Sequence, residues 1–342
     1  MRLALHSALL AAALLHAGAA PASAPVAAAS DPCAGIGADG GRRIPVSSAS
    51  ELDGALLTAR PGDAIVLAPG RYRGGFVSSA SGTAEAPIAL CGPADAELTK
   101  GRTDGGGFAL IIRGSWWTLA GFTVTDAQQG VRIEGGSHDR IVGLAIQRIG
   151  QEALSIKKHS SHNEVRATRI RDTGRHDPRY GEGIYIGTAP SQWCQWTACG
   201  PDRSDSNRIV ADTIGPGIGS DPVDVKAGTV GTMLDSNVID ASGSRNLKGD
   251  RNWTGGLAII NGRDVLVRWN RGRGAAFHGF SVQSDGAAKA YPATGARFIG
   301  NEVDLGDAPG EAILVGWNTG AVVACDNRAP PGRLAKTPCR ER

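Results

Sequence analysis

Seven short segments of the chain share one alternating pattern of apolar and polar positions. In each segment of five residues the second and fourth positions are apolar, while the fifth varies. Successive side chains of a strand point to opposite sides, so the second and fourth residues face a core and the third and fifth face outward. The pattern predicts seven equivalent β-strands: GVRIE (130–134), ALSIK (153–157), GIYIG (183–187), PVDVK (222–226), GLAII (256–260), GFSVQ (279–283) and AILVG (312–316).

A second series of short apolar segments accompanies the first: FTV (122–124), LAI (144–146), TRI (168–170), DTI (212–214), NVI (237–239), NRG (270–272) and NEV (301–303). The equivalent residues Ile133 and Ile156 lie 23 positions apart, and loops account for the longer gaps. Such a repeat predicts a solenoid, because one unit cannot bury its apolar face alone. We therefore predict an all-β fold, a right-handed single-stranded parallel β-helix over residues 33–328, followed by an irregular C-terminal tail at 329–342.

A polar column accompanies the second series, two positions before its last apolar residue. It consists of Asp212, Asn237, Asn270 and Asn301. Side chains stacked at a turn can hydrogen-bond along the axis of the solenoid. We assign this column a structural role and no catalytic one.

The segment SASELDGALLTA (48–59) predicts an N-terminal capping helix. Ser48 and Glu51 have the spacing of a capping box, and the leucines at 52, 56 and 57 are expected to share one face. AIVL (64–67) is then expected to begin the first coil. A cover at this end is expected because exposed strand edges invite association with other chains.

Residues 1–24 have the layout of a signal peptide: Arg2, an apolar stretch, and the small residues Ala22-Ser23-Ala24. No other segment is predicted to cross a membrane, so we expect a secreted or periplasmic protein. We also expect it to be a monomer. Six cysteines in an exported chain predict disulfides. Among the fifteen connectivities that six cysteines allow, we expect Cys33–Cys91, Cys194–Cys199 and Cys325–Cys339. The 36 basic and 33 acidic residues nearly balance, which argues against a nucleic-acid partner.

Three stretches resemble known β-helix proteins. ELDGALLTARPGDAIVLAPGRYRG (51–74) is similar to the opening of many secreted right-handed β-helix proteins of the pectate lyase-like superfamily, which includes chondroitinase- and alginate-lyase-type enzymes. GEGIYIG (181–187) and VDVKAGTVG (223–231) resemble a set of bacterial and fungal β-helix proteins described by their fold. The resemblance covers nearly the whole mature chain. It implies the architecture more firmly than the chemistry, because one fold carries many activities.

Outward-facing polar residues concentrate on the middle coils. If the strands stack in register, Lys157 and Lys226 flank Gly187 and frame a notch, with Tyr185 and Asp224 as its floor. Three carboxylates are then expected along one rim, just before the strands: Glu152, Glu182 and Asp221. Such a notch suits an anionic polysaccharide.

β-Elimination from a uronide needs a base beside the sugar carboxylate and a cation that neutralises this carboxylate. We interpret Lys226 as the base. Nearby aspartates would hold Lys226 protonated, and a Ca²⁺ ion on the row Glu152, Glu182, Asp221 and Asp224 would remove that conflict. His278, within two coils, is a candidate to protonate the leaving group.

The resemblance also implies roles for these residues. Glu152 and Lys157 have the spacing of alginate-lyase-type β-helices, in which the acid binds calcium and the lysine is the base. DPVDVK (221–226) is similar to the Asp-to-Lys spacing of other β-helix pectate lyases. The next coil, however, carries Tyr185 where the first group presents an arginine, so Lys226 is preferred to Lys157 as the base.

Loops that interrupt the same coils carry aromatic and basic residues. Exposed aromatic rings are platforms for stacking, and arginines bind carboxylates in a bidentate manner. The candidates for substrate binding are Arg179, Trp193, Trp196, Arg251 and Trp253. Packing of the tryptophans against the coil wall is the alternative.

Two other functions remain open at this point. A glycoside hydrolase would use two carboxylates, and Asp221 with Asp224 or Glu182 are the candidates. A non-catalytic glycan-binding or surface protein would need the loops and not the lysine. Outward charges on a solenoid can also be only a solvated face.

Overall fold

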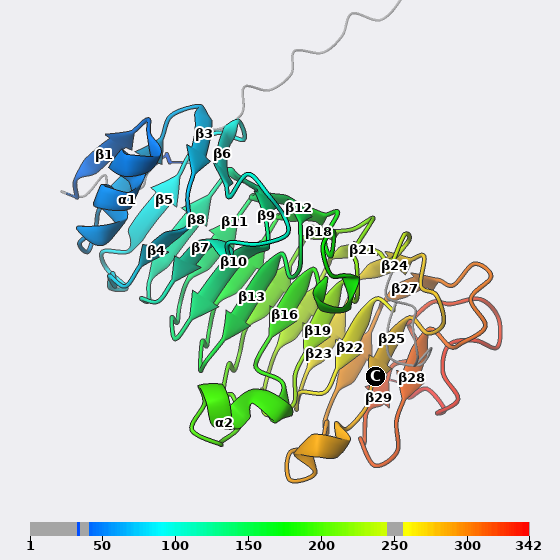
Figure 1. Ribbon diagram of the computed structural model, residues 1–342. Coiled ribbons are helices and arrows are strands. Elements are labelled where there is room, and N and C mark those ends of the chain that lie inside the picture. The colour runs from blue at the N-terminus through cyan, green and yellow to red at the C-terminus, as the bar shows by residue number, and fades with distance from the viewer. Residues whose placement is uncertain (1–32, 35–40, 245–255, 342) are drawn as a thin grey trace, which may run out of the picture. The chain divides into compact units, whose positions relative to one another are not determined.

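The computed structural model describes residues 33–34, 41–244 and 256–341. The predicted leader and the segment 245–255 lie outside these residues. The chain from Asp31 to Arg342 is one compact unit, in which three long parallel sheets wind around a common core (Figure 1). The prediction of an all-β parallel β-helix is confirmed.

Each sheet receives one strand from nearly every coil. The 11-stranded sheet contains β1 (Arg43–Val46), β2 (Ala64–Leu67), β5 (Ile88–Cys91), β8 (Trp117–Ala120), β11 (Arg140–Val142), β14 (Glu164–Arg166), β17 (Arg208–Val210), β20 (Met233–Asp235), β23 (Leu266–Arg268), β26 (Arg297–Ile299) and β29 (Val322–Val323).

The two other sheets have nine strands each. One contains β3 (Gly70–Arg73), β6 (Ala96–Thr99), β9 (Thr123–Ala127), β12 (Ala145–Ile149), β15 (Arg169–Arg171), β18 (Thr213–Ile214), β21 (Val238–Asp240), β24 (Arg271–Arg273) and β27 (Glu302–Asp304). The other, which we call the site sheet, contains β4 (Phe76–Ser78), β7 (Phe108–Ile112), β10 (Gln129–Glu134), β13 (Leu154–Lys157), β16 (Ile184–Ile186), β19 (Val223–Val225), β22 (Ala258–Ile260), β25 (Phe280–Val282) and β28 (Ile313–Val315).

Helices are few and short. The described residues contain α1 (Ala49–Leu57), α2 (Trp193–Trp196) and three 3₁₀ turns at Pro178–Tyr180, Pro190–Gln192 and Gly286–Ala288. None of these helices has the length and apolar character needed to cross a membrane.

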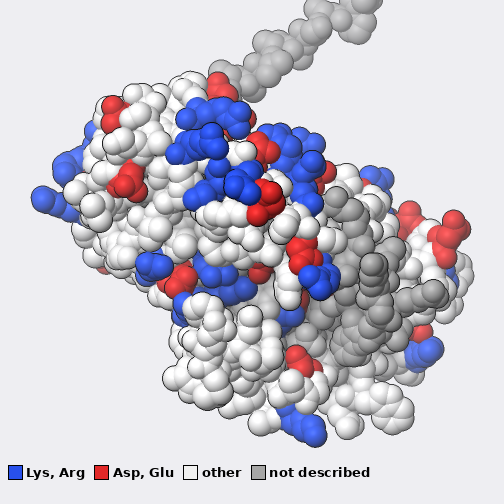
Figure 2. All heavy atoms as spheres, viewed as in Figure 1, with Lys and Arg blue, Asp and Glu red and all other residues white. Residues whose placement is uncertain are grey.

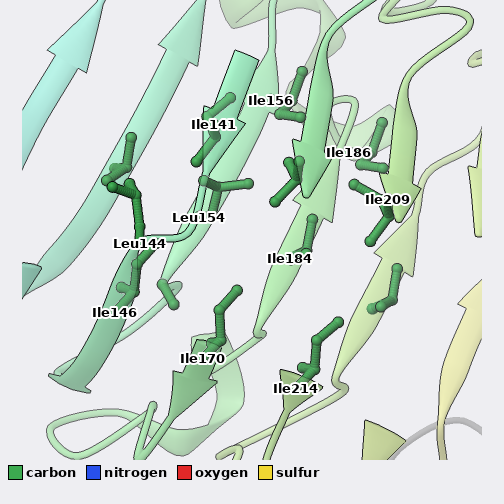
Figure 3. Packing of buried hydrophobic residues seen from close by; sticks show 14 of the residues in the cluster. Ile141, Leu144, Ile146, Leu154, Ile156, Ile170, Ile184, Ile186, Ile209 and Ile214 are labelled. Carbon is green, nitrogen blue, oxygen red and sulfur yellow. The ribbon is translucent and has the colours of Figure 1, made fainter. Parts of the chain in front are cut away.

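Apolar residues at the inward positions of both series stack from coil to coil in the core (Figure 3), whereas Val238 at an outward position is exposed. Ile133 pairs in register with Ile156, and Ile156 with Ile186, as the alternating pattern predicts. The segment GLAII is shifted by one residue from its predicted register. Ala258 and Ile260 face the core beside Val223 and Val225, so Asp224 pairs with Ile259 and not with Ala258.

The predicted polar column is a continuous hydrogen-bonded ladder. The side-chain oxygen of Asn237 accepts a bond from the Asp212 N–H, and the ladder continues in the same way through Asn270 and Asn301. It extends one coil further than predicted, to Asn327. Burial raises the pKa of Asp212 to about 7, so this carboxyl is largely neutral below that pH.

Helix α1 contacts β1 to β4 at the N-terminal end of the solenoid, and its capping box between Ser48 and Glu51 is present. Leu52 and Leu56 are fully buried, whereas Leu57 is 81% exposed. The prediction for Leu57 was wrong because it lies about 140° around the helix from Leu52. The first coil also begins earlier than predicted, since β1 pairs with β2.

All three expected disulfides are present: Cys33–Cys91, Cys194–Cys199 and Cys325–Cys339. At the C-terminal end, the carbonyls of Arg333 and Leu334 accept hydrogen bonds from Ala312 N and Ile313 N, next to β28. A bridge between Ala324 and Arg340 lies beside the last disulfide. The tail therefore covers the edge of the last coil.

Candidate active site

Two adjoining cavities lie on the outer face of the site sheet. The first, of about 580 Å³, is lined by residues of β10, β13 and β16 and by the loop around α2. The second, of about 410 Å³, extends over β19 and β22. The two cavities share Arg179, Glu182 and Lys226 in their walls. Together they form a groove that crosses several coils.

The predicted column of outward residues lies at the base of this groove. Arg132, Ser155, Tyr185 and Asp224 pair successively in register on four neighbouring strands. The Lys157 ammonium lies 3.9 Å from the centre of the Tyr185 ring, and that of Lys226 lies 4.9 Å from it. The structure therefore brings together the two lysines and the tyrosine that the register predicted to be neighbours.

Gly187 is required between the two lysines. Its φ is +86°, and a Cβ atom there would lie 2.7 Å from Thr229 Cγ2 and 3.2 Å from Lys226 Cβ. A side chain at this position would be strained and would displace Lys226. The glycine thus keeps the notch open, as the sequence predicts.

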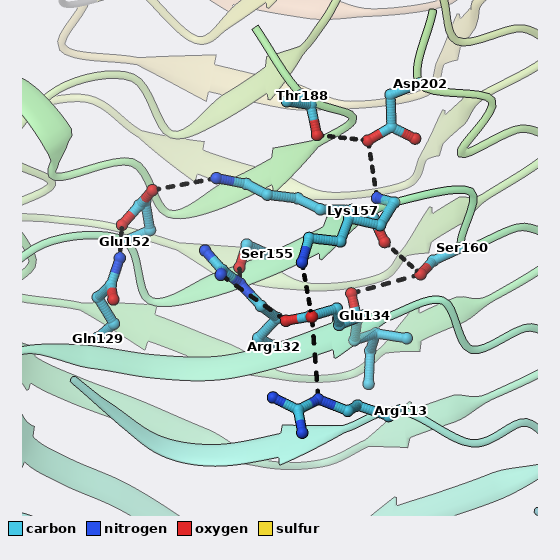
Figure 4. Close-up of polar contacts among 12 residues, drawn as sticks. Arg113, Gln129, Arg132, Glu134, Glu152, Ser155, Lys157, Ser160, Thr188 and Asp202 are labelled. Carbon is cyan, nitrogen blue, oxygen red and sulfur yellow. Dashed lines mark hydrogen bonds and ion pairs between the residues drawn. The ribbon is translucent and has the colours of Figure 1, made fainter. Parts of the chain in front are cut away.

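Each lysine forms an ion pair with a buried carboxylate. Lys226 Nζ lies 2.6 Å from Asp224 Oδ2, and Lys157 Nζ lies 3.3 Å from Glu152 Oε1. Glu152 also accepts a hydrogen bond of 2.8 Å from Gln129 Nε2 (Figure 4). The Lys226 side chain is 20% exposed and that of Lys157 is 11% exposed, so Lys226 is the more accessible amine.

The two lysines differ in electrostatic environment. Burial lowers the pKa of Lys157, although Glu152 opposes this effect. Burial also opposes a charge on Lys226, but the Asp224 carboxylate outweighs it, and the pKa of Lys226 is raised. In the ligand-free protein Lys226 therefore holds its proton more firmly than Lys157.

Burial raises the pKa of the two other titratable groups at the base of the groove, which favours their neutral forms. Burial raises the pKa of the Tyr185 hydroxyl, and Lys226 offsets this only in part. Burial and the nearby Glu152 and Asp224 carboxylates raise the pKa of Glu182 well above its ordinary value. The groove thus contains a neutral phenol next to two amines.

The loop that carries α2 forms one wall of the first cavity and is fixed to the coil by Asp202. This buried carboxylate accepts bonds from Lys158 N, His159 N and Thr188 Oγ1 at 2.7, 2.8 and 2.5 Å. Trp196 on this loop is 41% exposed, and the Lys158 ammonium lies 4.1 Å from the centre of its ring. On the face seen in Figure 2, Lys and Arg atoms gather beside this loop with acidic atoms among them.

The described residues show no assembled metal site on the predicted calcium row, so the Ca²⁺ ion stays a prediction. Ca²⁺ takes six to eight oxygen ligands, and the described part of the chain contains no group of three or more His, Cys, Asp or Glu side chains that could hold a metal ion. Glu152 and Asp224 each form an ion pair with a lysine, and burial raises the pKa of Glu182 well above its ordinary value, which disfavours the charged form that binds a cation. Asp221 lines the second cavity and accepts a bond from Ser220 Oγ.

Two other predicted site residues lie elsewhere. Trp193 is only 8% exposed, donates its indole N–H to Thr188 O and packs edge-on against Tyr291, so it is no stacking platform for substrate. His278 lines neither cavity: its Nδ1 accepts the Glu311 N–H at 3.0 Å, which makes it a corner hydrogen-bonder. Arg251 and Trp253 fall outside the described residues.

Several residues of the groove were not singled out from the sequence, among them Arg132, Gln129 and Lys158. Arg132 lies in the same outward column as Tyr185, and its guanidinium lies 4.0 Å from the centre of the Phe108 ring. Gln129 and Lys158 also line the first cavity. The column itself was a signal for Arg132. Lys158 could not be assigned to the groove from the sequence, because only the folded loop brings Trp196 over it.

No protein-family model matches the chain, and no curated protein matches it. Among solved structures, an alginate lyase from Paenibacillus sp. str. FPU-7 is 31% identical over 86% of this chain and 97% of its own, with a TM-score of 0.77.

Two further structures share the fold alone. Pectate lyase Pel9A is 17% identical, over 90% of this chain and 81% of its own, with a TM-score of 0.61. The Streptococcus pneumoniae surface protein and adhesin PfbA is 12% identical, over 82% of this chain and 81% of its own, with a TM-score of 0.58. Enzymes as well as a surface protein thus have this architecture. The fold alone therefore does not identify the function, and the residues of the groove have to be considered.

Proposed function

Because the chain belongs to the pectate lyase-like β-helix superfamily of polysaccharide lyases, we propose that it cleaves an anionic, uronic-acid-containing polysaccharide by β-elimination. The observation that carries this proposal is the position of Tyr185 between two amines in one groove. Three disulfides fit an oxidising compartment, which supports export to the periplasm or the medium.

In this reaction a base removes the proton from the carbon next to the sugar carboxylate. The electron pair forms a carbon–carbon double bond, the glycosidic C–O bond breaks, and the leaving oxygen takes a proton. We assign the base to Lys226, because it lies in the walls of both cavities and a chain that fills the groove passes over it. Tyr185, a neutral phenol beside Lys226, is the group that protonates the leaving oxygen.

Positive charge must also stabilise the substrate carboxylate as charge develops on it. Lys157 and Arg132 line the first cavity next to Tyr185 and are placed to do this. Arg179, whose side chain is 71% exposed, and Trp196 stand at the walls and are the remaining candidates for substrate binding.

The assignment of the base predicts a specific dependence on pH. Only the neutral amine of Lys226 can accept a proton, and Asp224 raises its pKa, so kcat/KM should increase as the pH rises into the alkaline range. Asp224→Asn removes the carboxylate that stabilises the ammonium. The pH at which kcat/KM rises should therefore be lower in this variant than in the wild type. The measurement is the initial rate at low substrate concentration across a range of pH. A rise that stays at the same pH would contradict Lys226 as the base.

The function itself is tested by a product screen. We expect the mature protein to release unsaturated, ultraviolet-absorbing ends from at least one of alginate, pectate and the glycosaminoglycans, with and without a chelator. New reducing ends without ultraviolet absorbance would instead indicate a glycoside hydrolase. Binding without either product would indicate a non-catalytic glycan-binding protein. Activity that is present without the chelator and lost in its presence would support the prediction of a bound Ca²⁺ ion.

A further inference from the structure

A third cavity, of about 540 Å³, lies on the outer face of the 11-stranded sheet. Its walls are outward-facing residues of β23, β26 and β29 with the chain end beside them, among them Leu266, Arg268, Trp269, Arg297, Ile299 and Arg340. None of these residues lines the groove on the site sheet. The third cavity is therefore separate from the candidate active site.

Trp269 occupies a position that the fold fills elsewhere with small residues. The residue directly after each of seven successive strands of this sheet has a positive φ. Besides Trp269, with φ +55°, these residues are glycine, alanine or serine: Gly121, Gly143, Ala167, Ala211, Ser236 and Gly300. The left-handed conformation costs free energy for a residue with a side chain, and a bulky aromatic there is unusual. The Trp269 side chain is 50% exposed, so burial in the core does not explain it.

The neighbouring residues accommodate the indole and hold it in place. A Cβ atom on Gly300, one coil further on, would lie 2.6 Å from Trp269 Cδ1, so only glycine leaves room for the ring. The guanidinium of Arg268 lies 4.4 Å from the centre of the indole ring. Arg268 is itself fixed by two hydrogen bonds to Asp235 Oδ2, at 2.9 and 2.7 Å. A strained residue that its surroundings hold in place is a candidate for function.

The charge of the cavity is positive. Arg297 and Arg340 line it against Glu341, and the third arginine in its walls, Arg268, is paired with Asp235. Arg297 and Arg340 form no ion pair with any residue that the structure describes. The backbone of Arg340 is fixed beside β29 by its bridge to Ala324 and by the Cys325–Cys339 disulfide.

We propose that this cavity is a second carbohydrate-binding site, which takes a segment of an anionic polysaccharide. The apolar face of a sugar ring packs on the exposed indole of Trp269, and the sugar carboxylates pair with the guanidinium groups of Arg297 and Arg340. The choice of an anionic polysaccharide as the ligand rests on the proposed function. A polymer that is long enough to fill the groove can also reach the 11-stranded sheet of the same molecule. Such a site would hold the enzyme on its polymer between cleavage events.

The test compares Trp269→Ala with Trp317→Ala. Alanine already occupies the position equivalent to Trp269 in two other coils, so the first change is compatible with the backbone. Trp317 is 92% exposed and lies outside the cavity, which makes its replacement a matched control. Both are made in a Lys226→Gln background so that the polymer is not degraded. Affinity is measured by retardation in native gels that contain alginate or pectate.

We expect Trp269→Ala to weaken polymer binding about tenfold and Trp317→Ala to leave it unchanged. Arg297→Gln should weaken binding and reduce its dependence on salt. In the wild-type background, Trp269→Ala should leave kcat on short oligosaccharides unchanged.

Unchanged retardation in both Trp269→Ala and Arg297→Gln would overturn the proposal. If neutral dextran also retards the protein, and Trp269→Ala reduces this retardation as much as it does with alginate or pectate, the ligand need not be anionic and that part of the proposal is overturned. Binding to anionic lipid vesicles that depends on Trp269, without any effect on polysaccharide, would assign the cavity to a membrane instead. Because retardation needs no catalysis, it can succeed where the product screen fails, and the two proposals are tested separately.

Discussion

Lys226→Ala is expected to lower kcat for β-elimination by about 10²–10⁴-fold, the usual contribution of a positioned general base. KM should change much less, because Arg132, Lys157 and Arg179 remain in the walls of the groove. The measurement is the initial rate of ultraviolet-absorbing product. Lys336→Ala is the control, since that lysine is 88% exposed and lines none of the cavities described above.

The ion pair between Lys226 and Asp224 shapes this experiment. Removal of Lys226 leaves the buried Asp224 carboxylate without its ion-pair partner, which can destabilise the fold by about 3–5 kcal/mol. Lys226→Gln retains a hydrogen-bond donor and is the second variant, with circular dichroism as the check on folding. If Lys226→Gln keeps activity within tenfold of wild type while Lys157→Gln abolishes it, the base is Lys157.

Asn270→Ala is expected to lower the free energy of unfolding by about 3 kcal/mol. The Asn270 side chain accepts the Asn237 N–H and donates to the Leu234 carbonyl, and both groups are buried. Its loss leaves a buried donor and a buried acceptor unpaired, and each unpaired group costs about 1–3 kcal/mol.

The measurement is chemical denaturation at constant pH. Gln195→Ala is the control, because Gln195 is an exposed residue of helix α2, and its cost should stay below about 1 kcal/mol. A cost of Asn270→Ala no larger than that of the control would show that the ladder is dispensable for stability.

The sequence predicted the solenoid and most of its register because apolar residues alternate strictly in most segments. The pattern failed at GLAII, where four of the five residues are apolar. Alternation cannot then distinguish inward from outward positions, and a shift of one residue reverses every side chain. The correct register places Ile259, rather than Ala258, beside Asp224 at the site.

Ion pairs at the site were harder to predict than positions. The notch of Lys157, Tyr185 and Lys226 followed from register alone. The Asp224 carboxylate that keeps Lys226 protonated was expected from the sequence, whereas the pairing of Lys157 with Glu152 was not, because the alternation pattern does not say where a flexible side chain ends. Trp193 was misplaced for a related reason, since a tryptophan in a loop can face either the solvent or the coil wall.

The tail at the C-terminal end has a consequence for assembly. A parallel β-helix ends in strands whose backbone groups would otherwise be free, and a second molecule could continue the stack there. Arg333 and Leu334 already accept hydrogen bonds from the backbone next to β28, and the Cys325–Cys339 link ties this part of the chain to the last coil. Head-to-tail growth into a fibre would first require this segment to detach, so the covalent link protects the protein against polymerisation.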